Sequence, residues 1–177
     1  MSMFRQYFQQ LRSVYTAPGR FFEDIFDHST FQKALMFAAL TGVVIALELG
    51  LSEVLESSSL GIIALVTVVT LFVLPLAMVA GVYIWSGFTK LCAYLLKEEL
   101  PYEPLLIMVG YSAAGFLFLG LGGWVGKFLS LAALIFQVAG MEKMMKCSRW
   151  TAVIFVFLPF SIFMVCVGFF TLMFKVF

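Results

Sequence analysis

Charge is scarce in this 177-residue sequence. Only 12% of the residues are charged and 63% are hydrophobic, with 11 Lys and Arg against 10 Asp and Glu. Soluble domains are about half apolar and about a quarter charged, so the composition excludes a water-soluble domain and a disordered tail. A net charge of +1 gives no field that attracts nucleic acid. The composition indicates an integral membrane protein whose first partner is the lipid bilayer.

Cysteine and histidine are also rare. Cys92, Cys147 and Cys166 lie far apart, in or beside apolar segments, and make no disulfide pattern. His28 is the one histidine, and no CxxC or HxxxH spacing occurs, so we expect no metal site and no cofactor. There is no GxSxG motif and no phosphate-cradling loop, and Ser112 has no His or Lys partner at its expected depth. The sequence therefore predicts a protein that is not an enzyme.

The positions of the few charges divide the chain into spans, because a transmembrane helix needs about 20 predominantly apolar residues. Residues 1–33 form a polar arm, and residues 34–177 form the membrane domain. The predicted spans are 34–51, 60–84, 105–121, 124–141 and 150–174. The predicted fold class is an all-α membrane protein, a bundle of five transmembrane helices with an amino-terminal amphipathic helix at the membrane surface.

Two details of the second and first spans follow from single residues. The second span is predicted as one helix that is kinked at Pro75 and continues beyond Trp85 as an amphipathic segment along the interface. A re-entrant hairpin broken around Pro75 and Gly81 is the alternative. Before the first span, Ser29 and Gln32 have the spacing of a capping box, which predicts the start of that helix.

Basic residues predict the orientation, because an excess of Lys and Arg marks the cytoplasmic side of a membrane. The arm and the second and fourth loops carry most of these residues, whereas the opposite side carries Lys127 and Lys175. We therefore expect a multi-pass protein of the inner cell membrane, with its amino terminus in the cytoplasm and its carboxyl terminus outside.

The arm has an apolar face, since Phe4, Phe8, Leu11 and Tyr15 recur at helical intervals. A helix of this kind lies in the headgroup plane, with its aromatic side in the membrane and its arginines at phosphates. The pattern predicts an anchoring arm. The alternative is a helix that docks a cytoplasmic partner through Phe4, Phe8 and Arg12.

Three polar residues are predicted within the spans, namely Glu48, Lys127 and Gln137. Burying such groups in a membrane is costly, so each is a candidate functional residue. Glu48 and Lys127 have opposite charges and similar predicted depths. Three interpretations stay open: pairing between the two helices, separate extension of each side chain to the interface, and a pathway for a solute or lipid.

Small residues predict close helix packing, because backbones in a membrane must approach one another to make contact. Gly110, Ser112 and Gly115 cluster in the third span around Tyr111. We take these four residues as candidates for helix packing.

Several motifs extend across the chain. They are Ser13, Pro18, Phe21, Phe22, Glu23 and Ile25 in the arm, Trp85 and Phe88 after the second span, Val109-Gly110-Tyr111-Ser112 in the third, the run from Leu134 to Gly140, and Arg149 to Val153 with Pro159 beyond. In these motifs, between residues 13 and 170, the sequence resembles the Yip1 domain family. The resemblance implies a cytoplasmic amino-terminal region, five spans and a carboxyl terminus outside the cytoplasm.

The sequence departs from the family's eukaryotic trafficking branch in two places. The acidic-Leu-Tyr-Gly-Pro element is absent from the arm, and the proline that usually follows the Gly-Tyr element is replaced by a stretch from Ala113 to Phe118. The chain therefore looks more like the prokaryotic branch, and the binding of Rab-type GTPases is not carried over to it.

These observations lead to two hypotheses about function. The first is a non-enzymatic scaffold, adaptor or subunit of a membrane assembly, in membrane trafficking or envelope organisation, working as a homo-oligomer or with other membrane proteins. The alternative is a subunit that transports lipid or a small solute, suggested by Glu48, Lys127 and Gln137 together with Pro75.

Overall fold

The computed structural model describes residues 3–56, 60–121 and 123–176 of the chain. These residues form helices and short connections, and no strand occurs among them. In chain order the helices are α1 (Met3–Thr16), α2 (Pro18–His28), α3 (Phe31–Glu56), α4 (Leu60–Leu95), α5 (Tyr102–Ser112), the 3₁₀-helix η1 (Ala113–Leu121), α6 (Gly123–Leu129), α7 (Ala132–Met145) and α8 (Arg149–Val176).

Five segments are long and apolar enough to cross a membrane. They are Phe31–Leu51, Ala64–Leu95, Tyr102–Leu119, Trp124–Met145 and Arg149–Val167. The third segment joins α5 to η1, and the fourth joins α6 to α7. The predicted fold class, an all-α membrane protein with five spanning helices, is confirmed.

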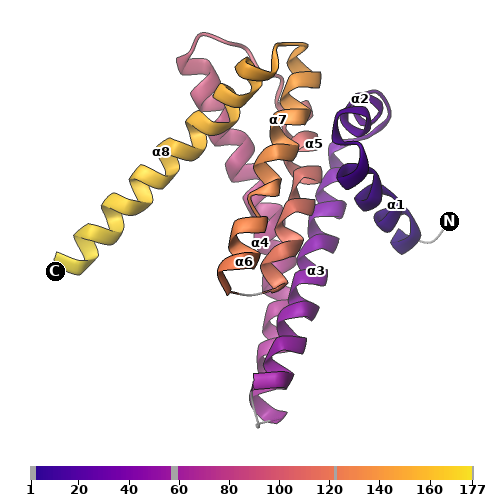
Figure 1. Cartoon of the computed structure of the whole chain (residues 1–177), viewed down its shortest axis with the longest axis vertical. Coiled ribbons are helices and arrows are strands. Elements are labelled where there is room, and N and C mark those ends of the chain that lie inside the picture. Colours follow the sequence, from indigo (N-terminus) through magenta and orange to yellow (C-terminus); the bar gives the residue numbers. More distant parts are fainter. Residues whose placement is uncertain (1–2, 57–59, 122, 177) are drawn as a thin grey trace.

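The helices α3 and α4 form a long antiparallel hairpin that is the axis of the molecule (Figure 1). The pair α5 and α7 packs beside one part of this hairpin, and α1 and α2 lie on its flank (Figure 1). We call the end that carries α2 and the α4–α5 and α7–α8 connections the α2 end. The adjacent ends of η1 and α6 stop well short of the far ends of α3 and α4 (Figure 1).

Glycine allows α3 and α4 to approach closely at Pro75. A Cβ atom on Gly42 would lie 2.8 Å from the Cα atom of Pro75 and 2.9 Å from the carbonyl oxygen of Leu74. Helices in a membrane gain stability from this kind of backbone contact, since lipid tails provide no hydrophobic drive between them. Gly42 was not among the predicted packing residues, because a lone glycine in an apolar run has no local signature.

The helix α4 passes through Pro75 without interruption and has 36 residues, a length of about 54 Å. The alternative of a re-entrant hairpin at Pro75 and Gly81 is therefore wrong. After Leu95 the chain leaves the helix through Lys97, which has a φ of 61°. The amide of Glu98 donates to the carbonyl of Ala93 at 3.0 Å, as in a Schellman motif.

Thr30, rather than Ser29, precedes the first residue of α3. The Thr30 carbonyl accepts hydrogen bonds from the amides of Lys33 and Ala34 at 3.1 and 3.3 Å. Ser29 terminates α2 in an extended conformation, and its hydroxyl lies 3.0 Å from the phenol oxygen of Tyr111. The predicted capping box is therefore wrong, because a residue 82 positions away engages the serine hydroxyl.

The third span changes its helix type after Ser112. Residues Ala113–Leu121 form a 3₁₀-helix of nine residues, which is long for a conformation that seldom exceeds four. A Cβ atom on Gly115 would overlap the backbone nitrogen of Ala133. The 3₁₀ segment therefore lies against the start of α7 with backbone touching backbone.

The helix α8 leaves the bundle (Figure 1). Its first half contacts α4 and α7, and Phe155, Val156 and Pro159 are buried there. Every residue from Ser161 to Val167 is exposed. This part of α8 diverges from the bundle, although the ring of Phe163 lies 6.0 Å from that of Trp85 in α4, centroid to centroid.

Candidate functional site

The arm is anchored to the membrane domain through its polar side chains. The phenol oxygen of Tyr7 lies 3.2 Å from the hydroxyl oxygen of Thr41 in α3. The Tyr15 hydroxyl donates to the Ala114 carbonyl in η1 at 2.6 Å. Tyr7 and Val14 are the buried residues of α1. The helix α1 therefore turns one face toward α3 and η1.

Tyr111 is the centre of these contacts. Its side chain is fully buried, and its phenol oxygen receives a hydrogen bond from the Gln10 amide at 3.3 Å and contacts Ser29. The Tyr111 ring lies 5.1 Å from the ring of Phe21 and 5.0 Å from that of Phe37, centroid to centroid. One side chain in α5 thus joins α1, the end of α2 and α3.

The phenols of the arm are neutral hydrogen-bonding groups. Burial, followed by the proximity of Tyr7 and Glu48, raises the pKa of Tyr15 to about 12. Burial raises the pKa of Tyr7 as well, and the hydrogen bond with Thr41 only partly opposes this effect. Both phenols therefore keep their protons throughout the physiological pH range.

The helix α2 is tied to α7 by an ion pair. The Nζ atom of Lys143 donates to Oε2 of Glu23 at 2.8 Å. The hydrogen bond and the charge of Lys143 lower the pKa of Glu23. This contribution to stability is therefore complete above the ordinary carboxyl range and is lost as the pH falls through the lowered pKa.

We expect Glu23→Gln to loosen α2 slightly. The pair is exposed, so amide hydrogen exchange in α2 at neutral pH should accelerate by at most about fivefold. Raised salt at neutral pH should have the same effect on the wild type. Asp24→Asn, at an exposed neighbour outside the two observed ion pairs, serves as the control. Equal amide exchange rates in the wild type and in both variants would show that the ion pair does not stabilise α2.

The predicted packing residues lie at close helix contacts. A Cβ atom on Gly110 would be 2.9 Å from the Ala34 carbonyl oxygen, so α5 touches the start of α3. Ser112 is fully buried, and its hydroxyl donates to the Met108 carbonyl at 2.7 Å. Gly115 faces Ala133 as described above. Gly140 in α7 lies against Met108 and Phe22 and was not singled out from the sequence.

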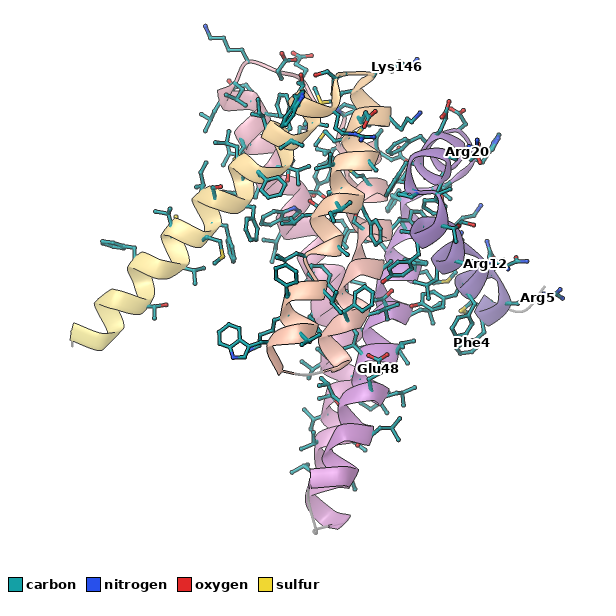
Figure 2. All side chains as sticks on the ribbon, viewed as in Figure 1. Phe4, Arg5, Arg12, Arg20, Glu48 and Lys146 are labelled. Carbon is teal, nitrogen blue, oxygen red and sulfur yellow. The ribbon has the colours of Figure 1, made fainter. Side chains whose placement is uncertain are left out.

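Glu48 and Lys127 do not form an ion pair in the structure. Oε2 of Glu48 is buried and has no hydrogen-bond partner among the described residues. The Nζ atom of Lys127 lies 5.5 Å from the centroid of the Trp124 ring. Trp124 and Lys127 are both exposed on α6, and Glu48 lies at about the height of α6 along the bundle (Figure 1, Figure 2). Of the three open interpretations, pairing is therefore wrong.

Gln137 lies elsewhere, beside α4. It is 4% exposed, and its Oε1 atom accepts a hydrogen bond from the indole Nε1 of Trp85 at 2.9 Å. The three predicted polar residues are thus not brought together. The contact of Trp85 with Gln137, 52 residues away in the chain, could not be predicted from the sequence.

The predicted docking residues point away from the membrane domain. Phe4 and Phe8 are 61% and 57% exposed, and Arg12 is exposed as well. Figure 2 shows Phe4 on the side of α1 that faces away from the α2 end, with Arg5 and Arg12 on its outer side. The outer surface of the arm therefore separates aromatic from basic side chains.

A cavity of about 490 Å³ lies between α4, α5, η1, α7 and α8. Gln137 and Trp85 are part of its wall, and the other lining residues are apolar, small or, at Ser130, a hydroxyl. All of the lining residues fall within the five membrane-spanning segments. In the part of the chain that the structure describes, no group of three His, Cys, Asp or Glu side chains is placed to hold a metal.

Comparison with known proteins identifies the family. The Yip1 domain model matches residues 12–170, which includes the end of α1, α2 to α7 and most of α8. No curated protein and no solved structure matches the chain. The match covers the motifs that the sequence shares with the family, from the arm to α8. The chain therefore belongs to the Yip1 domain family.

Proposed function

We propose that this multi-pass membrane protein acts without catalysis, as a scaffold or subunit of a membrane assembly, and that its first partner is a second copy of itself. The observation that supports this proposal is the exposed half of α8, in which every residue from Ser161 to Val167 is exposed. Helix packing and interhelical hydrogen bonds drive association in a membrane. A half-helix that is exposed at every one of these residues has few contacts within its own chain to fix its direction, and a neighbouring copy supplies more.

The proposed orientation places the α2 end in the cytoplasm of a cell with an inner membrane. Most of the Lys and Arg residues belong to the arm and to the segments near this end, and the positive-inside rule assigns such an end to the cytoplasm. In this orientation the exposed Phe4, Phe8 and Arg12 offer a surface where a cytoplasmic partner or the headgroups bind.

The transport alternative has less support. It was suggested by Glu48, Lys127 and Gln137, but Gln137 is buried beside α4 and Lys127 is exposed at α6, so the three do not lie together. A pathway for ions or solutes needs polar groups that follow one another across the membrane. We therefore favour assembly over transport.

Cysteine crosslinking in liposomes tests the proposed self-association. A background with Cys92→Ala, Cys147→Ser and Cys166→Ser receives single cysteines at positions 161–167. Reconstitution of the pure protein leaves only a second copy as a partner. We expect crosslinked dimers to recur every three to four positions, as one face of α8 meets its neighbour.

Ile84→Cys in the same background is the matched control, because Ile84 is 71% exposed on α4 and lies outside the proposed interface. It should crosslink weakly. Monomers at every position of α8, or crosslinking as strong at Ile84, would overturn the proposal. Dilution with added lipid should leave the α8 crosslinks unchanged and reduce those formed by random collision.

A further inference from the structure

The cavity between α4, α7 and α8 is open at the surface of the protein. Leu119, Leu131 and Phe163 belong to its wall and are 38%, 42% and 47% exposed. Because these residues lie in membrane-spanning segments, the opening faces lipid rather than water. The acyl chains of the surrounding lipids can therefore enter the cavity.

The dimensions and lining of the cavity suit a long apolar chain. Its volume of about 490 Å³ lies within the range of small-molecule sites, roughly 300–1,000 Å³. Phe116, Phe160 and Phe163 contribute aromatic surface, and no charged side chain is part of the wall. A neutral, elongated segment therefore fits, and a charged headgroup does not.

The side-chain amide of Gln137 in this wall has a hydrogen-bond donor without an acceptor among the described residues. An indole N–H can only donate, so the contact with Trp85 fixes Oε1 of Gln137 on the Trp85 side and turns Nε2 away from it. No hydrogen bond joins Nε2 to another residue in the described ranges. Gln137 is more than nine-tenths buried and lines the cavity. An amide donor without an acceptor is costly in such surroundings.

We propose that this cavity binds one acyl chain of a membrane glycerolipid, with the ester carbonyl oxygen accepting a hydrogen bond from Nε2 of Gln137. The ester supplies an uncharged acceptor at the end of a long apolar chain, which matches one donor in an otherwise apolar wall. The bound lipid also fills the space between α8 and the bundle.

Fluorescence quenching by brominated lipids tests this binding, because Trp85 is in the cavity wall. Trp124→Phe and Trp150→Phe remove the two other tryptophans, which are 86% and 80% exposed. The protein is reconstituted in unlabelled lipid with increasing shares of brominated diacyl phosphatidylcholine. We expect quenching of Trp85 that saturates at a low share of the brominated lipid.

Two glycines of α4 give matched variants for this assay. Gly81 lines the cavity, Gly87 does not, and a Cβ atom at either position meets no atom within 4 Å. Gly81→Phe should fill the cavity and abolish the saturating component, whereas Gly87→Phe should keep it. Gly81→Leu is the smaller substitute if thermal unfolding shows that Gly81→Phe does not fold. Equal quenching in the Gly81 and Gly87 variants would mean ordinary boundary lipid and would overturn the proposal.

The carbonyl contact is tested with an ether-linked lipid, which has the same chains and no carbonyl. We expect the wild-type cavity to prefer the ester lipid over the dialkyl ether by about fivefold, the value of one neutral hydrogen bond. The Gln137→Leu variant should bind the ester lipid and the ether lipid about equally. A wild-type protein that binds both lipids equally would show that Gln137 does not hold a carbonyl, and the proposal would fail.

Discussion

Gly115→Ala should cause a larger loss of stability than a methyl group added at the other close-packed glycines Gly42, Gly110 and Gly140. The new Cβ atom overlaps the backbone nitrogen of Ala133, and a backbone, unlike a side chain, cannot rotate away. Overpacking typically costs about 1–3 kcal/mol, and we expect the upper end here. For a chain of this length, about 3 kcal/mol lowers Tm by roughly 6–12 °C, measured by thermal unfolding in mild detergent.

Gly81→Ala is the control for this prediction. A Cβ atom at Gly81 meets nothing within 4 Å, and alanine is the better helix former by about 1 kcal/mol. The control should therefore match or exceed the wild type in Tm. If Gly115→Ala had the same Tm as Gly81→Ala, the backbone contact between η1 and α7 would be refuted.

Tyr111→Ala should have the second large effect. Removing a fully buried aromatic side chain costs about 3–5 kcal/mol, and here it also deprives Gln10 and Ser29 of their shared partner. We expect the arm to detach before the membrane domain unfolds. Limited proteolysis should then cut the arm between α1 and α3 at least about tenfold faster than in the wild type, since 1.4 kcal/mol corresponds to a factor of ten.

Two comparisons separate the ring of Tyr111 from its hydroxyl. Tyr111→Phe keeps the ring contacts with Phe21 and Phe37 and should cost about 1–3 kcal/mol through the unsatisfied polar groups. Tyr94→Ala, at a tyrosine of α4 that is 74% exposed, should change stability by less than about 0.5 kcal/mol. Proteolysis of the arm at the same rate in all three variants would exclude Tyr111 as its anchor.

The five spans were predictable because the charges lie between them. Glu53 and Glu56, Lys97 to Glu103, and Glu142 to Arg149 interrupt the apolar sequence, and a charge in the hydrocarbon costs several kcal/mol. Each interruption falls near a helix end. The change to a 3₁₀-helix at Ala113 was not predictable, because it accompanies the approach of Ala133 to Gly115, a tertiary contact.

The face of the arm was predicted only in part. Periodicity placed Phe4 and Phe8 on the apolar side and left Tyr7 among polar residues. In the structure Tyr7 is buried and the two phenylalanines are exposed. The contact of the Tyr7 hydroxyl with that of Thr41, 34 residues away, favours this orientation. The spacing of residues within the arm does not predict such a contact. The exposed half of α8, from Ser161 to Val167, is as apolar as the packed spans, so the sequence could not distinguish an exposed segment from a packed one.

The anchoring contacts of the arm also set an order of events during synthesis. Tyr15 and Ala114 are 99 residues apart, and Gln10 and Tyr111 are 101 apart. At about 5–20 residues per second, the ribosome needs about 5–20 s between the two halves of each contact. The arm is thus made first and can dock only after the third span has been made. Until the third span is inserted, its aromatic side chains have only the membrane surface to lie on, so the interfacial helix that the sequence predicts describes the nascent chain.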